Sequence, residues 1–305
     1  MDGIVAVHKA PGMTSHDVVA MARRITKERS CGHTGTLDPG ATGVLVLCFG
    51  KSTRLSQFLM DLPKEYVAEM VYGVSTDTGD SEGRITSADS DFAIPLSAVC
   101  AAIEGFQGEI EQIPPMVSAV HHEGRRLYEL AREGIEVART PRRVIIHQIS
   151  PVDVGAWPDP VVPGSRGQIR VRCSKGTYIR TLCQDICKSL GVSGHMGSLV
   201  RTESAGFTLA ESVTLGQLEE AAREGVLDMM VHEPARGIRH MLTFELTQVE
   251  SARVACGAPV LRPASSAADG ERVGLICPDG SLAAIGLATR AEQGIIIRPV
   301  IVFNA

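Results

Sequence analysis

Runs of apolar residues alternate with polar, glycine-rich stretches through the first 235 residues of the chain. Residues 3–8 (GIVAVH) predict a short strand, and residues 43–50 (GVLVLCFG) predict a buried strand bounded by glycines. Residues 66–74 alternate between apolar and polar side chains, which is typical of a strand with one buried face. Two further strands are predicted at residues 143–154 and 168–173, around a loop rich in proline and glycine.

Helical patterns mark four other segments. Thr14 or Ser15 can cap the first helix, whose apolar face consists of Val18, Met21, Ala22 and Ile25. Ser52 is expected to cap a second, short helix, with its apolar side chains turned inward. Residues 96–106 are expected to be helical, and residues 177–190 have the apolar spacing of a helix.

Residues 107–140 are expected to be irregular except for one short helix. That helix is predicted around Leu127, Tyr128 and Ala131, and it stops near Gly134. The composition changes after about residue 235, where short strand-like runs and turn signals begin. Residues 240–305 are therefore expected to form a small β-rich domain that follows a larger domain at residues 1–235.

The mixed order of elements in the larger domain indicates its fold class. It shows neither strict alternation of strands and helices nor a glycine fingerprint for nucleotides. An α+β fold is therefore expected, with a sheet flanked by helices.

Composition narrows the setting in which the protein works. No apolar run approaches the ~20 residues that span a bilayer, and the N-terminus lacks a charged-then-apolar signal pattern. A cytoplasmic protein is expected. The eight cysteines are scattered and form no C-x-x-C pair, so we expect reduced thiols and no metal site.

The charge is segregated along the chain, although the net charge is only −5. Residues 61–120 carry 2 basic and 11 acidic side chains, which gives −9. Residues 165–201 carry 7 basic side chains and one acid, which gives +6, and residues 121–147 are +2. Such a chain can present a basic face to phosphates while it stays acidic overall. Chance clustering on a solvated surface is the alternative.

The segment GHTGTLDPGATG (32–43) is the richest in candidate chemistry. Its glycines and proline predict a tight loop directly before the buried strand. The loop holds one carboxylate, Asp38, and loops on a rigid sheet are frequent positions for catalytic groups. Alternatively, Asp38 only caps a turn through its own backbone.

The same segment, extended to GHTGTLDPGATGVLVLCFGKSTRLSQFL (32–59), resembles the signature of the TruB-type tRNA pseudouridine-55 synthases. Further blocks of that family are similar to segments in the same order: HKAPGMTSHDVV (8–19), KEYVAEMVYGVSTDTGDSEG (64–83), QIPPMVSAVHHEGRRLYELAREGIEV (112–137), CSKGTYIRTLCQDI (173–186) and HMGSLVRTESAGF (195–207). The resemblance implies a pseudouridine-synthase-like, mainly antiparallel mixed sheet. It also implies a thumb-like RNA-binding insertion at about 107–140 and a PUA-like β-barrel at 240–305.

The resemblance also implies roles for individual residues. Asp38 is the catalytic aspartate, and the substrate-binding residues are Lys9, His33, Tyr66, Tyr178, Arg180 and Leu199. Within this set, Arg180 pairs with Asp38, Tyr66 stacks on or hydrogen-bonds to the target uracil, and Tyr178 and Leu199 line the base pocket. His33 fills the space that the flipped base leaves. Lys9 belongs to a Lys-Pro motif, which here reads Lys-Ala-Pro-Gly.

These roles agree with physical expectation. Uracil must leave the base stack before its glycosidic bond can be rearranged, and an adjacent arginine favours the ionised form of Asp38. Tyr178 and Arg180 are two residues apart, so they can face one site only at a helix start or a strand end. Taken singly, Tyr66 and Leu199 are better explained as core residues, and His33 as a structural hydrogen-bonding group.

The expected function is therefore the isomerisation of uridine 55 in the T-arm stem-loop of tRNA, by a monomer without organic cofactor, metal or obligate protein partner. Two alternatives stay open. One is a non-catalytic RNA-binding or RNA-folding protein on the same scaffold. The other is a related synthase that acts on rRNA or is guided by RNA.

Overall fold

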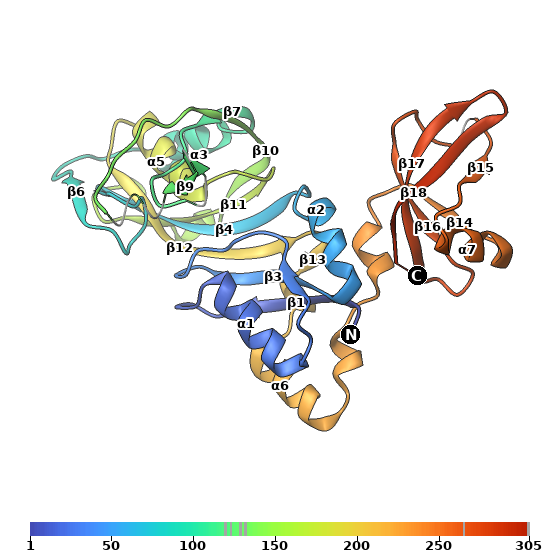
Figure 1. The fold of residues 1–305 in the computed structure, drawn as a ribbon. Coiled ribbons are helices and arrows are strands. Elements are labelled where there is room, and N and C mark those ends of the chain that lie inside the picture. The colour runs from blue at the N-terminus through green and yellow to red at the C-terminus, as the bar shows by residue number, and fades with distance from the viewer. Residues whose placement is uncertain (119–120, 123, 128–129, 131–132, 265, 304–305) are drawn as a thin grey trace.

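The computed structural model describes residues 1–118, 121–122, 124–127, 130, 133–264 and 266–303. These residues form a large mixed sheet with helices on both faces, followed by a smaller second sheet (Figure 1).

The main sheet has nine strands. The order along its path is β1 (Gly3–Lys9), β3 (Thr42–Phe49), β12 (Gly194–Ser204), β4 (Lys64–Tyr72), β11 (Arg166–Cys173), β10 (Arg142–Val152) and β7 (Gly108–Gln112). In addition, β2 (Cys31–His33) pairs with β3, and β13 (Phe207–Thr208) pairs with β12. Neighbouring strands are antiparallel except β12 and β3. The predicted α+β class with a mainly antiparallel sheet is confirmed.

Both faces of β1 and β3 are buried, which explains their nearly continuous apolar sequences. On one face they pack under α1 (Ser15–Thr26) and α6 (Leu215–Glu224). On the other face they pack against α2 (Ser56–Leu59) and residues from the C-terminal region. The strand that follows the Asp38 loop is thus held from both sides.

The remaining helices cover the other half of the sheet. They are α3 (Leu96–Glu104) and α5 (Ile179–Ser189), which pack on β4, β10 and β11 (Figure 1). Short 3-10 helices lie at Gly50–Leu55, Val154–Ala156, Leu209–Glu211, Leu227–Met230 and Pro234–Ile238. Strands β5 (Val74–Thr76) and β6 (Ile85–Ala88) form a hairpin around the polar turn at 77–83.

The first helix begins as its sequence predicts. Thr14 is its N-cap and forms a reciprocal capping box with Asp17. The prediction for Ser52 is wrong, because Phe49 precedes the 3-10 helix and Ser52 lies inside it. The Ser52 side chain is fully buried.

The prediction of an irregular segment after residue 107 is also wrong in part. Gly108–Gln112 is the edge strand β7, which pairs with β10. Its outward side chains are acidic, so the apolar signal of a strand is weak there. A hairpin of β8 (His121–His122) and β9 (Arg125–Arg126) follows. Of the short helix expected around Leu127, Tyr128 and Ala131, the structure describes Leu127, while Tyr128 and Ala131 lie outside the described residues.

The second sheet has five strands. Their order is β14 (Thr243–Glu245), β16 (Arg272–Ile276), β17 (Leu282–Ala291), β18 (Gly294–Val302) and β15 (Val260–Arg262), with α7 (Gln248–Ala255) beside them (Figure 1). Leu282, Ile285 and Phe303 belong to the same buried cluster as Ile4 and Val46 of the main sheet. The two sheets therefore meet in one shared apolar cluster, in addition to the clusters that each sheet has alone. Among the residues described, no helix is both long and apolar enough to cross a membrane.

Candidate active site

Asp38 lies in the loop that joins β2 to β3, at the end of the main sheet. Its carboxylate Oδ2 is 3.0 Å from Nε of Arg180, and its side chain is 41% exposed. The Arg180 side chain is only 5% exposed. The structure thus pairs a reachable carboxylate with a buried cation.

Arg180 makes three other contacts. Its Nη1 donates to the carbonyl of Thr78 at 3.1 Å and lies 3.6 Å from Oδ2 of Asp80. Its Nη2 donates to the carbonyl of Val117 at 2.9 Å. The planar fork of arginine can serve such separated acceptors at once, whereas the single ammonium of lysine cannot. Arg180 therefore links Asp38 to the 77–83 turn and to the insertion.

The start of α5 explains how residues 178 and 180 reach one site. Tyr178 is the N-cap and has an extended backbone, while Arg180 already belongs to the helix. The side chain of Gln112 fixes this start: its Oε1 accepts from the Tyr178 amide at 3.0 Å, and its Nε2 donates to the Tyr178 carbonyl at 3.2 Å. Gln112 was not among the residues that the sequence indicated, because its role depends on β7 ending beside α5.

A cavity of about 570 Å³ opens beside Asp38. The expected base-pocket residues Tyr66, Tyr178 and Leu199 all line it, together with Asp38 and Arg180. Tyr66 and Leu199 lie on the neighbouring strands β4 and β12, and both are less than a tenth exposed. Burial raises the pKa of the Tyr66 phenol, and the Arg201 guanidinium offsets this only in part. Tyr66 is therefore a neutral phenol near neutral pH.

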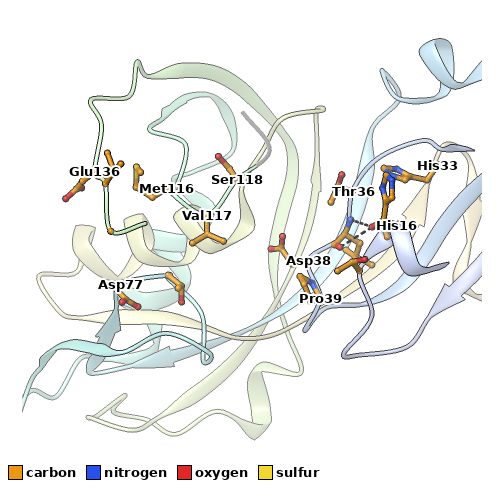
Figure 2. Close-up of a pocket in the computed structure, with 16 residues that line it drawn as sticks. His16, His33, Thr36, Asp38, Pro39, Asp77, Met116, Val117, Ser118 and Glu136 are labelled. Atoms are coloured by element: carbon orange, nitrogen blue, oxygen red, sulfur yellow. Dashed lines mark hydrogen bonds between the residues drawn. The ribbon is translucent and has the colours of Figure 1, made fainter. Parts of the chain in front are cut away.

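A second cavity of about 1060 Å³ lies on the other side of Asp38. Figure 2 shows Asp38 between Val117 of the insertion and the pair of His16 and His33. The Nδ1 atom of His33 accepts a hydrogen bond from the Gly35 amide at 3.2 Å. Burial lowers the pKa of His33, and His16 and Arg201 act in the same direction. His33 is thus outside the base cavity, on the wall of the larger one.

Lys9 occupies a different position from the expected substrate contact. Its side chain is fully buried, and its ammonium donates to the carbonyls of Ala10, Met13 and Pro39 at 2.9, 2.8 and 2.9 Å. Burial lowers the pKa of Lys9 to about 8, while Asp38 acts in the opposite direction. Lys9 therefore has no face toward either cavity, and we correct its assignment from substrate binding to support of the Asp38 loop.

The structure buries two further cations. Arg201 is 1% exposed and Lys64 is 8% exposed. The Lys64 ammonium donates to the carbonyls of Met60 and Leu62, and burial followed by the Arg201 charge lowers its pKa to about 8. Neither residue is indicated by the sequence, because burial of a charged side chain has no signal in a single sequence.

The basic segment at 165–201 presents less charge than its sequence suggests. Four of its seven basic side chains are in ion pairs, namely Arg166 with Glu69, Arg170 with Glu65, Arg172 with Glu203 and Lys175 with Asp61. Arg180 and Arg201 are buried. The basic face that this segment can present is therefore smaller than its +6 sum, because Glu65 and Glu69 of β4, Glu203 of β12 and Asp61 before β4 pair with these cations.

Taken together, the geometry defines a site in which the Asp38 carboxylate, paired with Arg180, lies at a cavity lined by two tyrosines and a leucine. Such walls suit a flat, uncharged ring, on which aromatic side chains stack. Within the described part of the chain, no group of three His, Cys, Asp or Glu side chains has the arrangement of a metal site.

Comparison with known proteins agrees with this class of site. The TruB family pseudouridylate synthase (N terminal domain) matches residues 23–179, and the tRNA pseudouridylate synthase B C-terminal domain matches residues 180–234. The chain belongs to the TruB family of pseudouridylate synthases.

Its relatives are similar over nearly their whole length. The tRNA pseudouridine synthase B of Pelotomaculum thermopropionicum is 42% identical over 288 residues, or 93% of this chain and 90% of that protein. The protein of the same name from Bacillus pumilus is 40% identical over 300 residues, or 97% and 96%.

Among solved structures, a chain of a Cbf5-Nop10-Gar1 complex has a TM-score of 0.75 and 27% identity, covering 98% of this chain and 84% of that one. A chain of an H/ACA RNP bound to a substrate RNA containing 2′-deoxyuridine has a TM-score of 0.74 and 25% identity, covering 99% and 84%. The two comparisons extend over both sheets of the protein.

Proposed function

We propose that this protein isomerises the uridine at position 55 of tRNA to pseudouridine, with Asp38 as the catalytic carboxylate. The single observation that carries the proposal is the contact of Asp38 with Arg180 at the mouth of the base cavity. Family membership supports the reaction type, and relatives that span nearly the whole chain are named as tRNA pseudouridine synthases.

In the reaction, the bond between C1′ of ribose and N1 of uracil breaks, the ring turns, and C5 bonds to C1′. The proton on C5 is lost to solvent, and N1 gains a proton. Asp38 acts on the nucleotide while the ring is held in the smaller cavity. Because uracil must leave its stack to enter, the walls compensate for lost stacking, at ~1–3 kcal/mol per base.

The remaining residues of the site hold the substrate. Tyr66 and Leu199 contact the ring from the sheet, and Tyr178 closes the cavity from the start of α5. Arg180 orients Asp38 through their ion pair. His33, on the larger cavity, occupies the place that the flipped base leaves in the T-loop.

We further propose that the loop end of the T-arm docks at the larger cavity, between the insertion and the start of α1. The domains would divide as residues 1–235 for catalysis, with the insertion at about 107–140 as a thumb, and 240–305 for added RNA contact. The protein would act as a monomer in the cytoplasm, where its substrate occurs.

The alternative of an RNA-guided synthase deserves comparison because the structural neighbours include H/ACA proteins. Those chains are 25–27% identical to this one, whereas the tRNA pseudouridine synthases quoted above are 40–42% identical. Identity therefore favours the stand-alone tRNA enzyme. The placement of Asp38, Arg180 and Tyr66 around one cavity favours an enzyme over a non-catalytic RNA-binding protein.

The test is pseudouridine formation in an unmodified tRNA transcript by the purified protein alone. The matched control is the same transcript with cytidine in place of the single target uridine. We expect one pseudouridine in the first transcript and none in the second. Activity only after addition of a guide RNA would support the RNA-guided alternative, and tight binding without turnover would support the non-catalytic one.

A further inference from the structure

The loop that carries Asp38 is held through its backbone carbonyls. In five consecutive residues each carbonyl oxygen has a partner: Gly35 and Thr36 bind Arg201, Leu37 binds Ser15, Asp38 binds the Ala41 amide, and Pro39 binds Lys9 and the Gly12 amide. The loop backbone is thus fixed on every residue around the catalytic carboxylate, while that carboxylate remains partly exposed.

Arg201 makes the largest contribution to this arrangement. Its Nε donates to the carbonyl of Val44 at 2.7 Å, its Nη1 to that of Thr36 at 3.1 Å and its Nη2 to that of Gly35 at 3.1 Å. Val44 follows the loop and the other two residues precede Asp38. One guanidinium therefore joins both ends of the loop.

The burial of Arg201 is costly for stability alone. The side chain is 1% exposed, and the ion pairs among the described residues do not include it. Its charge is solvated by carbonyl dipoles and by the Tyr66 side chain, without a carboxylate to neutralise it. A buried cation of this kind loses its hydration, and an apolar side chain would fill the core at lower cost. Its presence therefore indicates a role in fixing the conformation of the Asp38 loop rather than in stabilising the fold.

Ser15 holds Leu37, the residue directly before Asp38. Its hydroxyl donates to the Leu37 carbonyl at 3.2 Å and accepts from the Leu37 amide at 2.9 Å. Ser15 is 2% exposed and is the first residue of α1. The helix is thereby tied to the loop by one side chain.

We propose that Arg201 and Ser15 are positioning residues for the reaction, which fix the backbone before Asp38 so that its carboxylate stays at Arg180 and the base cavity. This inference rests on the proposed function. Neither residue needs to touch the base. Their effect is on the rate of the chemical step, because a displacement of about 1 Å at a reacting group can cost about a hundredfold in rate.

Arg201→Lys is the main test, because it keeps the charge and removes the fork that reaches three carbonyls. We expect kcat to fall at least tenfold, while KM and the tRNA dissociation constant stay within twofold of the parent chain. Arg236→Lys is the matched control: this arginine pairs with Glu211 and lies far from the loop in sequence and contacts. We expect it to keep the parent kcat.

Ser15→Ala is the second test, and it tests the positioning of the Asp38 loop on its own if Arg201→Lys does not fold. Loss of the hydroxyl should lower kcat threefold to tenfold with KM unchanged. Ser212→Ala is its control, since that hydroxyl donates only to the nearby Leu209 carbonyl. The double variant should lose less than the product of the single effects, because both residues hold one loop.

The outcomes separate this inference from the proposed function. A parent chain that makes no pseudouridine in tRNA contradicts the proposed function. A parent chain that is active, with kcat within twofold in either folded variant, overturns the positioning roles alone. A variant that only unfolds at lower temperature, with normal kcat per folded molecule, also overturns them, because a merely structural residue behaves in this way.

Discussion

Asp38 and Arg180 form an ion pair whose members differ greatly in exposure. Nε of Arg180 lies 3.0 Å from Oδ2 of Asp38, yet the arginine side chain is 5% exposed and the aspartate 41%. The cation is held by carbonyls of Thr78 and Val117 and cannot move far. The carboxylate is accessible from both cavities, which is the arrangement that a fixed base or nucleophile requires.

Asp38→Asn should abolish turnover and leave tRNA binding intact. The amide has nearly the size of the carboxylate, so the loop should keep its shape, but it is neither a base nor a nucleophile. The measurement is tritium release from tRNA labelled at C5 of uridine. Asp228→Asn, in a 3-10 helix away from both cavities, serves as control. Activity of Asp38→Asn within tenfold of the parent chain would contradict the catalytic role of Asp38.

Arg180→Lys should lower kcat at least tenfold even though the charge is kept. A lysine ammonium cannot serve Asp38, Thr78 and Val117 at once. One or two buried carbonyls would lose their donor, which costs about 1–3 kcal/mol each in stability. Tritium release and thermal unfolding should both be measured. If kcat is unchanged, the contact of residue 180 with Asp38 is sufficient, and the additional hydrogen bonds to Thr78 and Val117 do not contribute to catalysis.

The local elements around this site follow from the sequence, whereas the distant residues that hold the Asp38 loop do not. Thr14 as a helix cap and the buried strand before residue 50 follow from local patterns, and the structure has both. The start of α5 beside Tyr178 followed from a spacing that a helix interior cannot accommodate. Each of these rests on neighbours within one turn or one strand.

The support depends on distant neighbours and could not be predicted in this way. Arg201 reaches carbonyls of the Asp38 loop only because β12 lies next to β3. The acids that neutralise Arg170 and Arg172 likewise come from other strands. β7 was missed because Glu109 and Glu111 point outward on an edge strand. Strand register, rather than composition, decides all of these features.

The stability of the protein should fall in mild acid through His33. Burial lowers its folded pKa below the ordinary value, so the unfolded chain binds the proton first. Stability from this residue is complete above pH ~6.5 and is lost as the pH falls through the folded pKa. Protonation also removes the acceptor that Nδ1 offers to the Gly35 amide.

The check is urea unfolding of the parent chain and His33→Asn at pH 7.5 and pH 5.5. Asparagine keeps an acceptor but does not titrate, so the loss of stability at low pH should be smaller in the variant. His232 and His240, whose pKa values burial also lowers, are common to both proteins and cancel in the difference. Equal losses in the two proteins would contradict the role of His33.

Binding of tRNA should weaken with salt, with a slope set by the cations that are free to meet phosphates. Arg142 lines the base cavity, is exposed and has no ion pair in the described part of the chain. Arg142→Gln should reduce the slope of log K against log salt by about 0.7 to 0.9, the loss of one phosphate contact. Arg166→Gln, whose arginine pairs with Glu69, should change the slope less. The opposite order would mean that the ion pairs open on binding.

Because the two sheets share a buried cluster, a substitution in the second sheet should lower the free energy of unfolding of the main sheet. Ile285 is fully buried in the cluster that joins both sheets, so Ile285→Ala should cost about 2–5 kcal/mol. The only tryptophan, Trp157, lies in the core of the main sheet and reports on that part of the fold. Its fluorescence in urea should show a lower midpoint for Ile285→Ala. Val249→Ala, at an exposed position of α7, is the control and should leave the urea midpoint unchanged. If Ile285→Ala and Val249→Ala have the same midpoint, the two sheets unfold separately.

The core that joins the two sheets also limits how the protein can measure its substrate. Val44, Val46 and Cys48 of β3 pack in the same cluster as Leu282, Ile285 and Phe303, and β3 begins just after the Asp38 loop. The strand therefore runs from the Asp38 loop to the cluster that the second sheet shares. An RNA that contacts both the Asp38 loop and the second sheet must therefore match the distance that the shared cluster sets between them. Length, and not only sequence, becomes a property that the protein can select.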